Sequence, residues 1–484
     1  MSAFLIANMA PIMFGCLVLF LLLGYPVTFA LGANGIIFGI LGIYLGLLTP
    51  ALFQALPERL FGVMANDVLM AVPFFTFMGL ILERSGMAED LLETIGQLFG
   101  NIRGGLAYAV CVVGAMLAAT TGVVAASVIS MGLISLPIMI KYGYNQRLAT
   151  GVIAASGTLA MAIPPSLVLI IMADQLGKSV GDMYEGAMVP GLMLVGFYMI
   201  FVLIMSIIKP NSCPALPPEA RTLHGMKLFV RVVTTMLPPL ILIFLVLGTI
   251  FMGVATPTEG GAMGGTGALI LALLRKRINM KLLKQALEST ARLTTFVVFI
   301  LVGARVFSLT FYGVSGDLWV EHLLSGLPGG AIGFLIVVNV MVFFLAFFLD
   351  YFEIAFIILP LLAPVAEKLG IDLIFFGVLI GMNLQTSFMH PPFGFALFYL
   401  RSVAPKAVKT TDIYWGAIPF VLIQLIAVAT LIAFPQLASY RAMAKPGDKP
   451  AATTAVDLMQ QMQQSDDANK KDDEADRLKD LQAK

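Results

Sequence analysis

The chain has 484 residues, of which 59% are hydrophobic and only 12% are charged, and its formal net charge is +1. A soluble protein needs more polar surface than this, and the balanced charge gives no indication of a nucleic-acid partner. Apolar runs of about 20 residues, the length that crosses a bilayer as a helix, recur along the chain. The composition therefore predicts an all-α polytopic membrane protein that crosses a lipid bilayer many times, because barrel strands would alternate in polarity instead.

The first half, residues 1–208, is predicted to contain spans, a hairpin and a broken helix. The spans are expected near residues 5–23, 27–48, 66–83 and 187–208. The apolar segment 105–140 has a small and polar middle, ATTGVVAAS. At about 1.5 Å per residue, each arm of this segment reaches only part-way across a core roughly 30 Å thick. It therefore predicts a re-entrant hairpin, which is followed by a helix at 148–173 that is broken at Ala162–Pro165.

The second half, residues 235–434, has the same order of predicted elements. Its spans are expected at 235–253, 257–274, 293–309 and 414–434, its hairpin at 332–366 and its broken helix at 373–400. The residues between the halves, 209–234, are rich in Lys and Arg and are expected to form a cytoplasmic linker. The last residues, 435–484, are polar with mixed charge and predict a solvated tail. The three cysteines, Cys16, Cys111 and Cys213, lack metal-ligand spacing and are interpreted as packing residues.

A gapless offset of 227 residues relates the two halves. The pairs at this offset are Pro164 with Pro391, Pro165 with Pro392, Pro137 with Pro364, Lys141 with Lys368, Gly143 with Gly370 and Gly86 with Gly313. Each half then crosses the membrane five times and adds one re-entrant hairpin. Because five is odd, the second half is expected to be inverted relative to the first. The positive-inside rule makes the basic loops cytoplasmic, which places both termini in the periplasm. Segments 51–65 and 276–291 also pair, and they predict amphipathic helices along opposite interfaces.

The broken helices and hairpin tips predict binding sites. Unpaired backbone groups cost several kcal/mol in hydrocarbon, so a break is tolerated where it lines a cavity or an ion site. Two adjacent prolines free carbonyl groups that can coordinate a cation, and half-helix ends can face an anion. Two pseudo-symmetric cation sites on either side of one anion site are therefore expected at the middle of the membrane.

Neutral oxygen donors near these breaks suit a hard monovalent cation such as Na⁺. The candidates for the first ion site are Thr120, Thr121, Gly122, Ser127, Ser156, Thr158 and Pro164. The candidates for the second ion site are Asp350, Asn383, Thr386, Ser387, His390 and Pro391. The alternative for each hydroxyl is ordinary packing between membrane helices.

Ionisable and amide side chains in the second half are the candidates for substrate binding. These are Arg305, Gln385 and His390. Arg305 either attracts a carboxylate or extends towards the interface, and His390 either hydrogen-bonds to substrate, responds to pH or caps a half-helix. Asp350 either ligates a cation or carries a proton, because a charge inside a span is functional by default.

Three stretches resemble a known transporter family. These are GVATPTEGGAMGG at 253–265, the hairpin that contains Asp350, and KLGIDLIFFGVLIGMNLQTSFMHPPFGFALF at 368–398. Over about residues 1–440 the chain resembles the large membrane subunit, the M-type permease, of a tripartite ATP-independent periplasmic (TRAP) transporter. It departs from the common pattern at His390, where threonine is usual, and at Ser387, where glycine is frequent.

The resemblance implies a function that the residues alone do not show. It implies secondary active, Na⁺-coupled import of a small organic acid, a carboxylate, by an elevator mechanism in the bacterial inner membrane. It also implies a small four-helix membrane subunit and a periplasmic substrate-binding protein as partners. Na⁺ is the coupling ion and the metal expected, with no cofactor and no enzymatic activity.

Other functions fit parts of the pattern. A stand-alone Na⁺/dicarboxylate elevator transporter without a binding protein shares the inverted hairpin plan. An intramembrane enzyme is disfavoured because HExxH and GxSxG motifs are missing from the sequence. A channel lined by the two hairpins is a third possibility, which saturable uptake dependent on a binding protein would exclude.

Overall fold

The computed structural model describes residues 2–438, with the side chains of 2, 3, 120 and 121 left out, and the elements in that range are helices. The helices of the first half are α1 Ser2–Ala7, α2 Met9–Leu22, α3 Val27–Tyr44, η1 Pro50–Ala55, α4 Leu56–Met64, α5 Ala71–Arg84, α6 Met87–Phe99, α7 Gly105–Thr121, α8 Val124–Lys141, α9 Gln146–Thr158, η2 Leu159–Met161, α10 Leu167–Leu176, α11 Val180–Ile208, η3 Pro210–Ser212 and η4 Pro218–Ala220.

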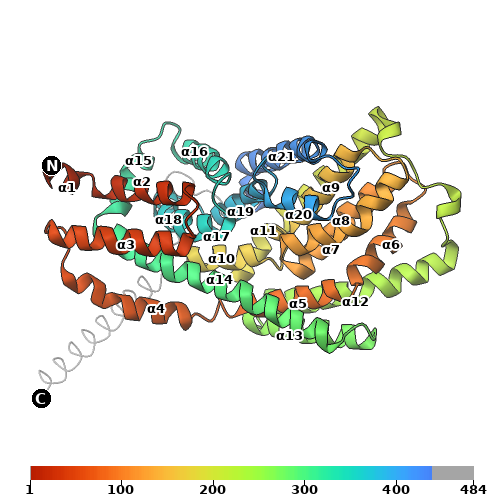
Figure 1. The fold of residues 1–484 in the computed structure, drawn as a ribbon, viewed down its shortest axis with the longest axis horizontal. Helices are drawn as coiled ribbons and strands as arrows, with labels where there is room; N and C mark the ends of the chain where they lie inside the picture. The colour runs from red at the N-terminus through yellow and green to blue at the C-terminus, as the bar shows by residue number, and fades with distance from the viewer. Residues whose placement is uncertain (1, 439–484) are drawn as a thin grey trace, which may run out of the picture. The chain divides into compact units, whose positions relative to one another are not determined.

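The helices of the second half follow in chain order (Figure 1). They are α12 Gly225–Phe251, α13 Pro257–Leu274, α14 Met280–Gly313, α15 Gly316–Ser325, α16 Gly330–Leu345, α17 Tyr351–Glu353, the π-helical turn η5 Ile354–Ile358, α18 Leu359–Lys368, α19 Leu373–Leu384, η6 Gln385–Phe388, α20 Phe395–Val403, α21 Thr410–Ala433 and η7 Pro435–Leu437. The predicted tail lies almost wholly beyond residue 438, outside the described residues.

Six helices of the described chain are long and apolar enough to cross a membrane. They are α3, α8, α11, α12, α14 and α21. The pair α15 and α16 would make a seventh span, bent by 115° at its break. The prediction of an all-α polytopic membrane protein is therefore confirmed, while the inversion of the second half stays a prediction.

Two predicted segments differ from the observed helices. Asn8 interrupts the predicted first span, so that α1 and α2 replace one helix over 5–23. Segment 276–291 is not a separate amphipathic helix, because most of it is the first part of the 34-residue helix α14. Met280–Gly313 contains no proline to end the helix, and its first glycine is Gly303. Segment 51–65 is helical as predicted, as η1 and α4.

The glycine-rich stretch at 253–265 starts α13 and packs it against α5. The Thr256 hydroxyl accepts a hydrogen bond from the Glu259 N–H at 3.2 Å, and the Glu259 carboxylate accepts one from the Thr256 N–H at 2.8 Å. This reciprocal capping box satisfies two N–H groups at the start of the helix. A Cβ on Gly264 would lie 2.5 Å from Met78 Sδ of α5. Small residues thus bring the two helices close together, as is common in membranes.

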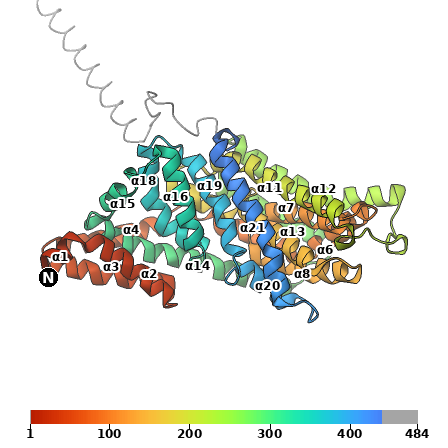
Figure 2. The same ribbon diagram turned by 90° about the horizontal axis from the view of Figure 1, so that it is seen from above.

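The broken helix of each half packs against helices of the other half. A Cβ on Gly151 of α9 would collide with the backbone of Gly416 of α21. A Cβ on Gly377 of α19 would lie 2.7 Å from Leu176 of α10 and 2.8 Å from Met183 of α11. Figures 1 and 2 show α19 beside α21. The segments that carry the candidate site residues are therefore held together by contacts between the two halves.

Candidate functional site

The first hairpin brings its tip to the first helix break. Its arms α7 and α8 turn back on one another. At the end away from the tip, the N–H of Leu106 at the start of α7 donates a hydrogen bond of 3.2 Å to the hydroxyl of Tyr144, which follows α8. The tip is Gly122, whose φ of 58° ends α7. A Cβ on Gly122 would lie 3.7 Å from the carbonyl oxygen of Pro165. The tip therefore lies against the break, as the sequence predicted for these two segments.

The first break is enclosed by protein. α9 continues into η2, and the chain then leaves the helix until α10 begins at Leu167. Every residue from 148 to 173 is buried. The peptide bond between Pro164 and Pro165 is cis, as is the bond between Pro391 and Pro392 in the second break. The Ser166 hydroxyl donates to the carbonyl of Met161 at 2.9 Å across the break.

Two predicted residues of the first site place buried hydroxyls at this break. Ser156 Oγ forms no regular hydrogen bond to a described residue, although the Cys111 thiol interacts with it. Thr158 Oγ1 donates to the carbonyl of Ala155 at 2.8 Å. Ser127 is buried at the start of α8, beside Val128, which packs on Gly157. The side chains of Thr120 and Thr121 lie outside the described set. The structure thus places Gly122 against Pro165 at the break, whereas Ser156 packs on Gly114 of α7, eight residues before the tip.

Gln424 of α21 also reaches the first break, and the sequence analysis missed it. Its Nε2 donates to Thr158 Oγ1 at 3.2 Å and to the Tyr198 hydroxyl at 2.9 Å. Its Oε1 is buried without a hydrogen-bond partner among the described residues. A lone amide in the apolar run VLIQLIAV was the signal that could have revealed it.

The second break is held to its hairpin by amide groups. Asn383 Nδ2 donates to the backbone carbonyl of Asn339 at 2.8 Å and to its side-chain oxygen at 3.1 Å. Asn339 lies on α16, the first arm of the second hairpin. The Asn383 side-chain oxygen is itself buried without a partner in the described chain, as is Gln385 Oε1. The hydroxyls of Thr386 and Ser387 donate to the carbonyls of Asn383 and Leu384 at 2.7 Å and 2.6 Å. Their oxygens can still accept or ligate.

His390 is enclosed by aromatic rings of the same hairpin arm. Its ring stacks on Phe347 with centroids 4.2 Å apart, and the Phe343 ring meets it edge-on at 4.3 Å. Only 1% of His390 is exposed, and neither ring nitrogen makes a regular hydrogen bond to a described residue, although the Ala346 backbone interacts with the ring. Beyond His390 the chain emerges, and Phe393 is 53% exposed.

Asp350 caps the short helix after the second hairpin tip. Its Oδ1 accepts a hydrogen bond from the Glu353 N–H at 2.9 Å, and Glu353 Oε2 accepts one from the Asp350 N–H at 3.0 Å. The same carboxylate interacts electrostatically with Tyr399 of α20. No hydrogen bond among the described residues joins Asp350 to Asn383 or Thr386. The sequence analysis therefore missed a structural role, which the spacing of DYFE signals as a capping box.

Arg305 lies on α14, away from the contacts that build the second break. It is half-buried and forms no hydrogen bond or ion pair with another described residue. α14 meets the second hairpin on either side of it, through ring contact of Phe296 with Phe352 at 5.6 Å and a hydrogen bond from the Tyr312 hydroxyl to the carbonyl of Pro360 at 3.4 Å. The structure does not bring Arg305 together with Gln385 or His390 by any such contact.

Comparison with known proteins decides the family. Residues 14–437 match the family described as "Tripartite ATP-independent periplasmic transporter, DctM component". The chain belongs to this family. As a TRAP large permease it is a multi-pass protein of the inner membrane and a transporter component rather than an enzyme, which confirms those predictions.

Relatives of this large permease span nearly its whole length. The C4-dicarboxylate TRAP transporter large permease protein DctM of Rhodobacter capsulatus is 29% identical, over 89% of this chain and 96% of its own. DctM of Pseudomonas aeruginosa is 30% identical over 78% and 87%. The ectoine TRAP transporter large permease protein TeaC of Halomonas elongata is 28% identical over 89% and 98%. The YdaH transporter of Alcanivorax borkumensis shares the fold, with a TM-score of 0.56 at 14% identity over 81% and 90%.

Proposed function

We propose that this TRAP large permease imports a small organic acid by Na⁺-coupled secondary transport, with one cation bound at each helix break. The observation that carries the proposal is the pair of breaks, each beside a hairpin and each with a buried amide oxygen that has no partner in the described chain, Gln424 Oε1 at the first and Asn383 Oδ1 at the second. A buried polar atom that lacks a partner costs about 1–3 kcal/mol, so such atoms gather where a ligand satisfies them.

The first cation site is built from Ser156 and Thr158 of α9 beside the first hairpin. Backbone carbonyls between residues 159 and 165 supply further oxygens, because the helix no longer uses them all. The donors are neutral, and a hard monovalent cation accepts such ligands without a partner anion. Thr120, Thr121 and Ser127 of the hairpin complete the set of proposed ligands.

The second cation site is built from the Asn383 side-chain oxygen with the hydroxyls of Thr386 and Ser387. Asn339 accepts both hydrogen bonds of Asn383 Nδ2, which fixes the orientation of the amide and leaves its oxygen for the cation. Asp350 contributes its charge from the helix end. Pro391 interrupts the helix, and its neighbours release backbone carbonyls in the same way as at Pro164.

The substrate lies between the cation sites in this proposal. The starts of α10 and α20 present helix N-termini, which favour a carboxylate. His390, Gln385 and Arg305 are the proposed polar contacts to substrate. Relatives are named for C4-dicarboxylates, ectoine and isethionate, all small polar organic solutes, which supports a small organic acid here.

Transport in this proposal is an elevator movement of the hairpins and broken helices against α3, α5, α13 and α14. A small four-helix membrane subunit and a periplasmic substrate-binding protein complete the transporter, as the word tripartite in the family's description supports. Both termini face the periplasm, because that orientation puts the basic loops on the cytoplasmic side.

Uptake by the reconstituted three-component complex tests this function. Labelled C4-dicarboxylate, ectoine and isethionate are the probes, with an inward Na⁺ gradient or an equal K⁺ gradient. We expect at least one solute to accumulate with Na⁺ and the binding protein, and not with K⁺. Equal uptake under both gradients would exclude Na⁺ coupling, and equal uptake without the binding protein would favour the stand-alone transporter.

A further inference from the structure

Three arginines from α12 and the end of α13 converge on one acidic residue of α6. Arg275 Nη1 lies 3.2 Å from Asp90 Oδ2, Arg277 Nη2 lies 3.2 Å from Asp90 Oδ1, and Arg231 Nη2 lies 3.6 Å from the same Oδ1. Glu93 is the second acid in reach, at 4.0 Å from Arg231 Nη2. Glu89 is a third acid, since a Cβ on Gly86 would lie 3.7 Å from Glu89 Oε2 and 2.5 Å from Arg277 Nη1. With Lys227 of α12, four basic groups therefore face three carboxylates, which leaves an excess of one positive charge.

The excess charge is accessible. The side chains of Arg231 and Arg277 are 46% and 42% exposed, whereas that of Asp90 is 15% exposed. Both ion pairs of Arg231 use Nη2, so its other N–H groups remain available to a ligand. Lys227 lies one helical turn before Arg231, so its positive charge is on the same face.

An apolar groove begins beside these arginines. It is lined by Val233, Thr234, Leu237, Pro238 and Ile241 of α12 and by Leu271 of α13. The groove and the arginines meet at Thr234, whose backbone carbonyl accepts a hydrogen bond from Arg275 Nη2 at 3.1 Å. The groove is open, since Leu237 is 49% exposed and Ile241 is 54% exposed.

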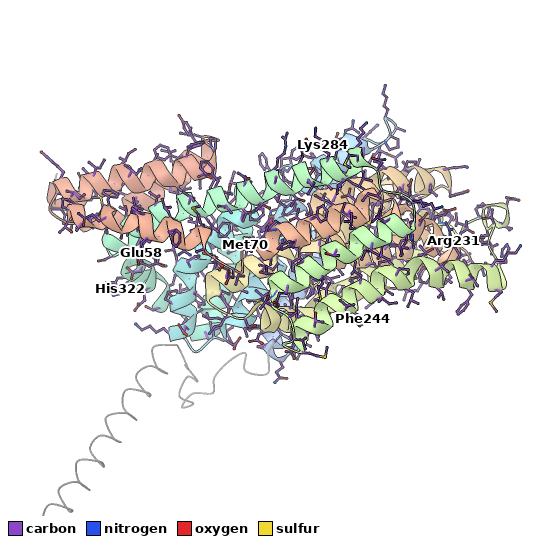
Figure 3. The ribbon with its side chains drawn as sticks, turned by 90° about the horizontal axis from the view of Figure 1, so that it is seen from below. Glu58, Met70, Arg231, Phe244, Lys284 and His322 are labelled. Atoms are coloured by element: carbon purple, nitrogen blue, oxygen red, sulfur yellow. The ribbon has the colours of Figure 1, made fainter. Side chains whose placement is uncertain are left out.

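The spacing along both helices puts the charged groups at the same end of the groove. On α12, residues 227, 231, 234, 238 and 241 follow one another at intervals of three and four, which places them on one helix face. On α13, Leu271 precedes Arg275 by four residues. Figure 3 labels Arg231 towards one end of α12 and Phe244, which is 74% exposed, farther along the same helix. A basic end thus continues into an apolar stripe.

We propose that α12 and α13 bind an anionic phospholipid, with an acyl chain in the groove and the phosphodiester on Arg231 beside Lys227, while Arg277 holds α6 through Ser85, Gly86 and Asp90. The ligand matches the site in both parts, because a phosphodiester carries one negative charge and its acyl chain is apolar. Guanidinium groups bind phosphate oxygens through paired N–H donors, and basic sites at the ends of membrane helices favour anionic headgroups. The bound lipid holds α6 against α12 and α13 by compensating the surplus charge. This inference does not depend on Na⁺ coupling.

The test compares lipid retention by purified full-length variants. Wild-type protein, Arg231→Gln and Leu237→Trp are extracted in mild detergent from membranes that contain phosphatidylglycerol and phosphatidylethanolamine. The phosphatidylglycerol retained per chain is then measured by mass spectrometry. Arg231→Gln removes one exposed charge, and Leu237→Trp fills the groove without touching the arginines. Arg147→Gln is the control, because it breaks an exposed ion pair with Asp412 on α9 and α21.

We expect Arg231→Gln to lower retained phosphatidylglycerol about fivefold, since one basic group near a membrane is worth roughly 1 kcal/mol. Leu237→Trp should also lower it, because the indole ring takes the place of the acyl chain. Arg147→Gln should retain as much as wild type, and phosphatidylethanolamine should not change. Equal retention in all four proteins would overturn the proposal. So would a crosslink from a photoreactive residue at Ile241 to another protein subunit in the intact complex, because a protein would then occupy the groove.

Discussion

The two helix breaks differ in what covers them, although a constant offset of 227 residues relates them. At the first break, burial is continuous through both prolines, and Gln424 of α21 closes over Thr158. At the second, burial ends at His390, and Pro392 and Phe393 are exposed. Burial therefore extends through both prolines in the first half and ends just before them in the second.

The largest expected effect concerns access to the two breaks. In a variant without Cys16, Cys111 and Cys213, cysteine replaces either Ser166 or Phe393. Because Ser166 is fully buried and Phe393 is 53% exposed, we expect a water-soluble thiol reagent to modify Phe393→Cys at least about a hundredfold faster. Equal rates would show that the two breaks do not differ in the way the structure describes.

A large effect is also expected from the amide of the second break. Asn383→Leu removes the buried oxygen that we assign to the cation, so the Na⁺ concentration for half-maximal uptake should rise about ten- to a hundredfold. Asn339→Ala is the matched control, because it removes one of the two acceptors of Asn383 Nδ2, keeps the backbone carbonyl of residue 339 and leaves the Asn383 oxygen in place. It should shift Na⁺ dependence less than Asn383→Leu, and the opposite order would remove Asn383 from the site.

Substitutions at Asp350 separate its charge from its role as a helix cap. Asparagine is as good an N-cap as aspartate, so Asp350→Asn keeps the cap and removes the charge. We expect half-maximal Na⁺ to rise about tenfold in Asp350→Asn, because charge-assisted contacts are worth about 1.5 kcal/mol or more. An unchanged Na⁺ dependence in Asp350→Asn, with a loss of stability of about 1 kcal/mol in Asp350→Ala, would show that Asp350 serves as a cap alone.

The smallest expected effect is at the seal over the first break. Gln424→Leu removes the donor to Thr158 and should raise half-maximal Na⁺ about fivefold, because one neutral hydrogen bond contributes about 1 kcal/mol. Tyr198→Phe is the comparison variant, since it removes a hydroxyl that interacts with both Gln424 and Thr158 and keeps the donor from Gln424 to Thr158. If both variants shift Na⁺ dependence equally, Gln424 acts through general packing instead.

Much of the local architecture was predictable because it depends on local signals. Prolines, glycines and the length of apolar runs located both hairpins and both breaks, and α8 and the segment α17–α18 begin and end at paired positions, Val124–Lys141 and Tyr351–Lys368. The capping box of Asp350 and Glu353 was equally visible in the sequence. Because a charged residue in an apolar segment predicts a functional site, Asp350 was interpreted as a cation ligand or proton carrier and not as a helix cap.

The remaining features depend on contacts between distant segments. Gln424 meets Thr158 only because Gly151 and Gly416 let α9 and α21 approach closely, and Asn339 meets Asn383 across the second hairpin. A single sequence shows that Gln424 and Asn339 are polar residues in apolar runs, but it does not show which neighbouring helix their side chains face. The continuity of α14 through residues 280–291 was missed for a different reason. The amphipathic composition of this segment predicted a separate interfacial helix, but no residue in it interrupts the helix that continues to Gly313.

Thermal unfolding of the purified permease in NaCl and in KCl at equal ionic strength tests the central claim, that each break holds a cation. A ligand that binds the native state stabilises it, by about 2.7 kcal/mol at a hundred times its dissociation constant. We predict that Na⁺ raises the Tm of wild type above its value in K⁺. Ser156→Ala and Asn383→Leu should each retain part of this rise, and the double variant none. A double variant stabilised by Na⁺ as strongly as wild type would contradict the account.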